Sequence, residues 1–333
     1  MSRVSVALSR AAHLTRWATA LAVTTVLLAA AAPASAKSGS SGCGLPFATG
    51  QATTLTVSSG GTQRTAIVYV PTGYDGHKPL PLVLDLHGSG SNAAEQMVRS
   101  ELSDRAELNT FITVAPQGLG GRWNVPGVTT GANLADDEQF LSDLIDHLQA
   151  TLCIDERRVY GAGYSGGGRM ISQYACDHPE RVAAIAPVAG LRAGVPVAGP
   201  DGWEPDPATC TPERPVPVIA FSGTADPVNP FAGGGAAYWR YGVPAAQARW
   251  AEINDCRQGP RTRSVTEHVD QVAYEACPHK ADVVMYLIEG GGHVWPSSEA
   301  FVGSGLGEVT FEIDANALIW DFFRHYKLPN NRN

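Results

Sequence analysis

Short apolar runs alternate with amphipathic segments along most of the chain, and this alternation limits the possible folds more than any other feature. The runs resemble strands that are buried on both faces. They occupy residues 82–86, 111–115, 158–162, 182–188, 216–221 and 283–288. Apolar side chains recur at helical spacing within residues 136–152, about 167–176 and 315–323. The sequence therefore predicts an α/β fold with a mostly parallel central sheet and helices on both faces.

The remaining segments fit one domain. Residues 53–58 and 65–70 are patterned like strands, and Gly60-Gly61 suits the turn of a hairpin between them. Residues 190–211 and 230–242 are rich in Gly and Pro, which favours loops above the sheet over linkers between domains. A chain of 333 residues is long enough for one large domain.

The first 36 residues have the features of a secretory signal peptide. Three arginines accompany the start of an apolar run at residues 17–32, and residues 34–36 (ASA) have the small-x-small pattern of a cleavage site. The alternative is a transmembrane anchor, but the run is short for a span. We expect cleavage after Ala36, secretion to the extracellular space and no membrane association afterwards. The expected parts are a signal peptide at 1–36, a Ser/Gly spacer at 37–42, a catalytic domain at 43–327 and a tail at 328–333.

Composition and charge exclude several classes of partner. The chain is 44% hydrophobic and 17% charged, which is a globular balance. Its formal net charge is -8. A protein this acidic has no broad attraction for phosphate backbones or anionic lipid surfaces, so we expect no nucleic-acid partner.

The cysteines predict disulfide bonds. An even number in an exported chain is typical of disulfide pairing, although six cysteines allow 15 pairings. Cys256 and Cys277 bracket a polar segment, which favours a bridge between them. We expect the other bridges to join Cys176 with Cys210 and Cys43 with Cys153. Zinc binding is disfavoured because the chain has no C-x-x-C pair.

A nucleophile motif follows one of the expected strands. Residues 163–167 (GYSGG) match G-x-S-x-G around Ser165. The motif alone is weak, since an ordinary Gly-rich turn also produces it, but here it lies between a strand pattern and a helix pattern. A serine at that place sits on a sharp turn, and glycines two residues away on each side relieve the crowding. We expect Ser165 to be a nucleophile.

A base and an orienting acid are needed because a serine hydroxyl is a poor nucleophile at neutral pH. His293 follows the strand at 283–288 and a glycine-rich loop, whereas the other histidines lie in helical or polar surroundings. Asp226 follows the strand at 216–221. The alternatives are that His293 is a loop residue with no catalytic role and that Asp226 belongs to a simple Asp-Pro turn. The order Ser165, Asp226, His293 is that of the α/β-hydrolases.

Backbone donors must stabilise the oxyanion that forms during acyl transfer. The N–H of Gly166, directly after the nucleophile, is one candidate, and the N–H of Ser89, in the loop after strand 82–86, is the second. In that loop His87 is expected to be structural. Asp137 is expected to act as a dipole partner at a helix start.

The aromatic residues on nearby loops leave two roles open. Trp123 and Trp295 are either substrate-facing or part of the core, with neither favoured. Tyr164, next to the nucleophile, is a further candidate for substrate binding.

Four motifs together resemble one family. Residues 86–88, 163–167, 223–226 and 291–296 are similar to those of the secreted esterases that include bacterial feruloyl esterases and short polyhydroxybutyrate depolymerase-like enzymes. The resemblance runs from about residue 43 to 326. It implies an α/β-hydrolase with a Ser-Asp-His triad at Ser165, Asp226 and His293, and neither metal nor cofactor. It also implies that Trp295 borders the site.

The substrate implied by this resemblance is a feruloyl or acetyl ester on plant cell-wall xylan, and the partner an ester linked to a polysaccharide or polymer. Polyhydroxyalkanoate depolymerisation is the nearest alternative. Depolymerases that attack solid polymer usually carry a separate binding domain, for which we expect no room here. A secreted serine peptidase and an acyltransferase are alternatives from other classes.

Overall fold

A ten-stranded mixed sheet forms the centre of the structure, a computed structural model that describes residues 39–129 and 134–330. The strand order is β1-β2-β4-β3-β5-β6-β9-β12-β11-β10. The strands from β4 to β12 in this order are mutually parallel. They are β3 (Leu80–Leu86), β4 (Ile112–Pro116), β5 (Ile154–Tyr164), β6 (Ile185–Val188), β9 (Val218–Gly223) and β12 (Val283–Ile288). The predicted parallel centre of the sheet is confirmed.

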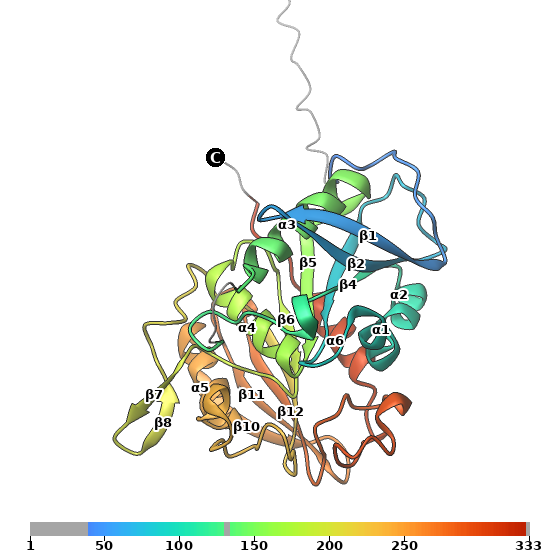
Figure 1. Ribbon diagram of the computed structural model, residues 1–333. Coiled ribbons are helices and arrows are strands. Elements are labelled where there is room, and N and C mark those ends of the chain that lie inside the picture. The colour runs from blue at the N-terminus through green and yellow to red at the C-terminus, as the bar shows by residue number, and fades with distance from the viewer. Residues whose placement is uncertain (1–38, 130–133, 331–333) are drawn as a thin grey trace, which may run out of the picture. The chain divides into compact units, whose positions relative to one another are not determined.

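Antiparallel strands complete both edges of the sheet (Figure 1). At one edge, β1 (Gln51–Ser59) and β2 (Thr62–Val70) form the predicted hairpin. At the other, β10 (Gln258–Ser264) and β11 (Val269–Glu275) extend the sheet from β12. The sequence did not indicate β10, because every residue of this strand is exposed and it lacks an apolar face.

One segment that was predicted to be a loop contains secondary structure. Within residues 190–211, β7 (Pro196–Gly199) and β8 (Gly202–Pro205) pair as a separate two-stranded ribbon. Their side chains are mostly exposed, so no alternation of buried and exposed residues marks them in the sequence.

Helices pack against both faces of the sheet, as predicted. The α-helices are α1 (Ala93–Ser100), α2 (Leu102–Asn109), α3 (Asp137–Thr151), α4 (Gly166–Asp177), α5 (Val243–Ile253) and α6 (Ala315–Phe323). Short 3-10 turns lie at Leu119–Gly121, Ala237–Trp239, Pro278–Lys280 and Glu299–Phe301. Among the described residues, no helix is both long and apolar enough to cross a membrane.

Two apolar cores result from this arrangement, one on each face. Successive residues of β3 alternate between them: Leu82 and Leu84 belong to one core, and Val83 belongs to the other. Buried side chains of α3, α4 and α5 complete the first core, and those of α2 and α6 complete the second. All seven β3 residues are buried, which explains the continuous apolar run in the sequence.

Aspartate side chains cap the starts of α3 and α6. Asp136 accepts a hydrogen bond from the Gln139 N–H at 2.9 Å at the start of α3. Asp314 accepts one from the Ala317 N–H at 2.8 Å at the start of α6. Each carboxylate also lies at the positive end of the helix dipole.

The cysteines form the three expected disulfides, Cys43–Cys153, Cys176–Cys210 and Cys256–Cys277. The first ties the segment before β1 to the start of β5. The second joins the end of α4 to the loop after β8, and the third joins the end of α5 to the end of β11. Disulfides of this number are typical of proteins from oxidising compartments.

The disulfides close loops of different length, so we expect them to contribute unequally to the free energy of unfolding. The Cys43–Cys153 bridge spans 110 residues and the Cys256–Cys277 bridge spans 21. Because loop-closure entropy rises with the logarithm of loop length, the longer bridge should stabilise the protein by about 1.5 kcal/mol more. We expect the double alanine variant at Cys43 and Cys153 to unfold at lower urea concentration than the variant at Cys256 and Cys277. Equal midpoints, or the reverse order, would contradict this expectation.

Candidate active site

The three residues expected to form a triad follow strands that end at the same edge of the sheet. Ser165 follows β5, Asp226 follows β9 and His293 follows β12. These strands run parallel, in the order β5-β6-β9-β12. The carboxyl ends of parallel strands lie together, and ligands of open α/β sheets bind there.

Ser165 sits at a sharp turn between β5 and α4. Its φ is 51° and its ψ is -110°, which is a strained conformation for a residue other than glycine. Its N–H donates to the Val188 carbonyl at 2.9 Å, and its carbonyl accepts from the Arg169 N–H at 3.0 Å. The turn predicted from the GYSGG segment is therefore present.

Glycines allow the close approach that makes this turn possible. A Cβ added to Gly163 would lie 2.5 Å from the backbone of Gly167. A Cβ added to Gly167 would lie 2.2 Å from the Leu86 carbonyl oxygen of β3. Both distances are far below van der Waals contact, so no larger residue fits at either position.

His293 and Asp226 form a buried pair. The Nδ1 atom of His293 lies 2.7 Å from Oδ2 of Asp226, and both residues are at most 6% exposed. The other carboxylate oxygen accepts from the N–H groups of Val228 and Asn229 at 2.8 and 2.7 Å. A carboxylate on Nδ1 favours the tautomer that carries its proton there, which leaves Nε2 as an acceptor.

The backbone of the His293 loop is anchored beside the nucleophile. The Tyr164 hydroxyl donates to the His293 carbonyl at 2.6 Å, and the two rings are 5.1 Å apart. The Ala225 N–H donates to the Gly291 carbonyl at 3.0 Å, which joins this loop to the loop after β9. The structure thus brings the histidine loop to the residue that precedes Ser165. Among the described residues, no hydrogen bond joins the Ser165 hydroxyl to the His293 ring.

The two expected oxyanion donors are neighbours. A Cβ added to Gly166 would lie 2.9 Å from the Ser89 nitrogen and 2.3 Å from its hydroxyl. Gly166 is the first residue of α4, so its N–H has no partner within the helix. In the described part of the chain, the Ser89 N–H donates to no backbone or side-chain acceptor. Both amides are therefore available to bind an anion between them.

Comparison with known proteins shows the family to which the chain belongs. No protein-family model matches the chain. It is 31% identical over 238 residues to a probable feruloyl esterase C of Aspergillus terreus, covering 69% of this chain and 76% of the relative. The chain belongs to the feruloyl esterase-like family of carboxylic ester hydrolases.

A second relative and one solved structure also resemble the chain. Feruloyl esterase B of Piromyces equi is 30% identical over 277 residues, which is 80% of this chain and 46% of that protein. The chain thus spans less than half the length of this relative. An acetyl xylan esterase structure from Aspergillus awamori superposes with a TM-score of 0.52 at 16% identity, over 73% of this chain and 94% of that one. At this identity the likeness shows the α/β-hydrolase fold alone.

His87 has the structural role expected of it in this feruloyl esterase-like chain. Its Nε2 accepts a hydrogen bond from the Gly118 N–H at 3.0 Å, and its Nδ1 lies 2.8 Å from the Gly88 carbonyl. This pattern requires the proton on Nδ1 and a neutral ring. Burial lowers the pKa of His87, which favours the same state.

The aromatic side chains near the site are interior groups. Trp123 is 4% exposed and donates to the His87 carbonyl at 2.7 Å. Trp295 is fully buried and donates to the Asn316 side chain at 3.1 Å. Tyr164 is 4% exposed, with its hydroxyl on the His293 carbonyl. Both tryptophans thus pack in the core, while substrate contacts of these three residues stay predictions, because Ser165 and His293 are buried to a similar degree.

Asp137 does more than the dipole role expected of it. It forms a buried ion pair with Arg64 at 2.6 Å and accepts from the Asn124 N–H at 2.7 Å. Arg64 also lies over the Phe140 ring, at 3.9 Å from its centre. The pair joins β2, the loop after β4 and the start of α3. The sequence did not indicate it because its partners are 73 residues apart.

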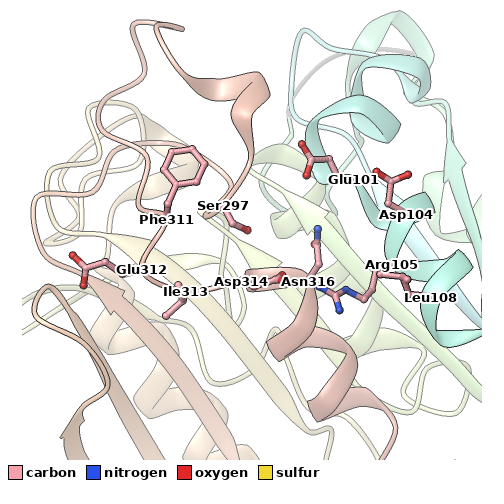
Figure 2. Close-up of a pocket in the computed structure, with 10 residues that line it drawn as sticks. All are labelled: Glu101, Asp104, Arg105, Leu108, Ser297, Phe311, Glu312, Ile313, Asp314 and Asn316. Atoms are coloured by element: carbon pink, nitrogen blue, oxygen red, sulfur yellow. Dashed lines mark hydrogen bonds and ion pairs between the residues drawn. The ribbon is translucent and has the colours of Figure 1, made fainter.

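An open pocket of about 300 Å³ lies between α2 and the segment at residues 311–316 (Figure 2). Glu101, Asp104 and Arg105 line one side, and Phe311 and Glu312 line the other. Burial and the nearby carboxylates raise the pKa of Glu101. None of the three expected triad residues lines this pocket.

A buried carboxyl group beneath the Ser89 loop was not identified from the sequence. Asp85 lies in β3 and is fully buried, with hydrogen bonds from Gln96 at 2.7 Å and Ser100 at 2.5 Å. Burial raises its pKa to about 7, although both hydrogen bonds oppose this shift. The Ser100 carbonyl in turn accepts from Asn316, which accepts from Trp295. A buried polar chain therefore links β3 to the segment that follows His293.

The raised pKa of Asp85 predicts a pH dependence of stability. An unfolded aspartate titrates near 4, so the folded protein binds the extra proton between about pH 4 and 7 and loses stability as pH rises through that range. We expect Asp85→Asn, which can keep both hydrogen bonds, to gain about 2.5 kcal/mol relative to wild type between pH 5 and pH 8. The measurement is urea unfolding at both pH values, with the exposed Asp104→Asn as control. A constant difference between Asp85→Asn and wild type would contradict the shift.

Proposed function

We propose that the protein is a secreted serine carboxylic ester hydrolase in which Ser165, His293 and Asp226 act as nucleophile, base and orienting acid. The buried contact between His293 and Asp226, on a loop bonded to Tyr164, is the observation that carries this proposal. It supplies an oriented imidazole beside a serine on a strained turn. The hydrogen bond between Ser165 and His293 is expected to form when substrate binds, as is common for catalytic contacts.

The proposed reaction has two acyl-transfer steps. In the first, the Ser165 oxygen attacks the ester carbonyl while His293 Nε2 takes its proton. The N–H groups of Ser89 and Gly166 bind the oxyanion, and His293 then gives the proton to the leaving alcohol. In the second step, His293 takes a proton from water, the hydroxide attacks the acyl-enzyme, and the proton returns to Ser165. Asp226 holds the imidazole in the required tautomer and stabilises its charge throughout.

The proposed substrate is a feruloyl ester of plant cell-wall xylan, with acetyl esters as the second choice. The names of the relatives from Aspergillus terreus and Piromyces equi support feruloyl esters. The fold alone does not separate these acyl groups, because it hosts many reactions. We propose the domain at residues 43–327 as the catalytic unit.

The proposed location is extracellular. The disulfides among the described residues support passage through an oxidising compartment. The expected signal peptide at residues 1–36 lies outside the described residues. Because residues 34–36 have the pattern of a cleavage site, we propose that the mature protein begins at Lys37.

Removing the nucleophile is the direct test of the proposed chemistry. We expect Ser165→Ala to lower kcat for p-nitrophenyl acetate by about 10⁴-fold or more, because no hydroxyl remains to form the acyl-enzyme. Thermal melting should stay close to that of wild type, since the side chain is small. Ser172→Ala, which removes a buried hydroxyl two turns further along α4, is the matched control and should retain activity. Activity of Ser165→Ala close to that of wild type would refute the assignment.

A second variant tests the orienting acid. Asp226→Asn should lower kcat by about 10⁴-fold, because an amide favours the wrong imidazole tautomer. Single-turnover measurements of p-nitrophenol release would show whether acylation itself is slowed. A variant with wild-type acylation would remove Asp226 from the mechanism.

The substrate class requires a comparison of products. Purified protein should release ferulate from methyl ferulate and from feruloylated arabinoxylan, and it should release little 3-hydroxybutyrate from polyhydroxybutyrate. Acetylated xylan and a fluorogenic peptide panel complete the set, with Ser165→Ala as the blank. A higher kcat/KM for hydroxybutyrate oligomers than for methyl ferulate would overturn the proposed acyl preference.

A further inference from the structure

Arg169 is a buried cation beside the proposed oxyanion donors. It lies in the first turn of α4, four residues after Ser165, and is 9% exposed. Its Nη2 donates to the Ser89 hydroxyl at 3.3 Å. A Cβ on Gly166 would lie 3.4 Å from the same nitrogen, so the guanidinium borders the space between the two amides.

The two residues in direct contact with the Arg169 guanidinium are neutral. The Tyr238 ring covers the guanidinium at 4.0 Å from the ring centre, and Ser89 supplies a hydroxyl. None of the ion pairs in the described part of the chain includes Arg169. Every Asp and Glu of the sequence lies within residues 39–129 or 134–330, so the remainder of the chain adds no acidic side chain. A buried arginine without a carboxylate is unusual, because buried charges are normally paired.

A second buried arginine adds to the local positive charge. Arg192 is 6% exposed and lies over the rings of Trp239 and Tyr241 at 3.6 and 3.9 Å. It donates to the carbonyls of Tyr238 and Tyr241, which holds the segment that covers Arg169. Burial is the main cause that lowers the pKa of Arg192 to about 10, and the charge of Arg169 adds to it, so the two cations lie close enough to repel each other. Both remain charged at neutral pH.

The site opens toward solvent at the Ser89 loop. Ser89 and Gly90 are exposed, and Tyr238 is only partly buried. A guanidinium has five N–H donors in a planar fork that suits a carboxylate. The Ser89 hydroxyl and the Tyr238 side chain, which offers its ring face and a hydrogen bond, do not engage all of these donors. Arg169 therefore has the capacity to bind an anion that enters next to the nucleophile.

We propose that Arg169 forms a subsite for a carboxylate carried by the substrate close to the scissile ester. The substrate class is an anionic ester, with the carboxylate on either the acyl part or the alcohol part. This inference rests on the proposed function, since it places the subsite next to Ser165. A net charge of -8 on the whole protein repels anions, so any preference for them must come from a local cation.

Two matched ester pairs test the proposal and separate the two sources of the carboxylate. Mono-p-nitrophenyl succinate and p-nitrophenyl butyrate differ by a carboxylate on the acyl part. The esters 4-acetoxybenzoate and 4-methylphenyl acetate differ by a carboxylate on the alcohol part. We expect wild type to have a higher kcat/KM for the anionic ester of at least one pair. Arg169→Gln should lower that preference by about 10- to 100-fold, which is the usual value of a hydrogen bond between charged groups.

Three controls keep the result interpretable. Arg169→Lys keeps a positive charge and should retain part of the preference. Arg324→Gln removes an exposed arginine that pairs with Asp321 in α6, and it should leave the preference unchanged. Circular dichroism and thermal melting establish that each variant is folded.

The possible outcomes are distinct. An equal loss on both members of a pair in Arg169→Gln would mean that Arg169 only orients Ser89, and would overturn the subsite. If Arg169→Gln does not fold, the wild-type protein still tests the subsite. Equal kcat/KM of wild type for the anionic and the neutral ester of both pairs would overturn it. If wild type hydrolyses none of the four esters, the proposed function fails separately. Calorimetric titration with monomethyl succinate then tests the subsite. Binding to wild type that is lost in Arg169→Gln supports the subsite. No binding to wild type, or unchanged binding in Arg169→Gln, overturns it.

Discussion

The first turn of α4 lies in direct backbone contact with β3 and β5, and the arrangement of the whole site depends on this contact. Only glycine at positions 163 and 167 allows it, because any Cβ would overlap the neighbouring backbone. The same close approach places Gly166 against Ser89, so the proximity of the two proposed oxyanion donors follows from the packing. It also forces Ser165 into the strained φ/ψ that directs its side chain out of the turn. The turn at Ser165 and the position of Gly166 beside Ser89 therefore both depend on the close packing of α4 against the sheet.

Buried polar contacts hold the loops above this edge, in addition to the apolar packing of residues such as Trp295. Asp226 is fixed by two backbone N–H groups and holds His293, and Tyr164 holds the backbone of the same histidine. A second polar chain, from Asp85 through Ser100 to Asn316, reaches Trp295 from the other side. Buried polar networks of this kind restrict the motion of the groups that they join. The contacts of Asp226 and Tyr164 fix the position of His293, which is the preorganisation that the proposed reaction requires.

Much of the fold could be predicted from the sequence because its signals are local. Strands buried on both faces leave continuous apolar runs, as in β3, and α3 and α6 carry both an apolar face and an aspartate cap. The elements that escaped prediction lack such signals. β10 is exposed throughout, and α1 buries Gln96 and Ser100 rather than an apolar stripe. The polar residues are buried there because Asp85 is their partner, a relationship that only the tertiary structure creates.

The site likewise contains residues with a local sequence signal and residues whose positions depend on tertiary contacts. Ser165, Asp226 and His293 could be selected because each follows a strand end in the order that the fold requires, and the structure joins the last two directly. The burial of Trp295 and the position of Arg169 depend on contacts with distant segments, which no spacing in the sequence reveals. The central claim is that His293 and Asp226 make Ser165 nucleophilic. Treatment with a fluorophosphonate, followed by mass spectrometry of the peptides, tests it most directly. The account predicts one adduct, on Ser165, that forms in wild type and is lost in His293→Ala; labelling at another residue, or labelling of Ser165 at an unchanged rate in His293→Ala, would contradict it.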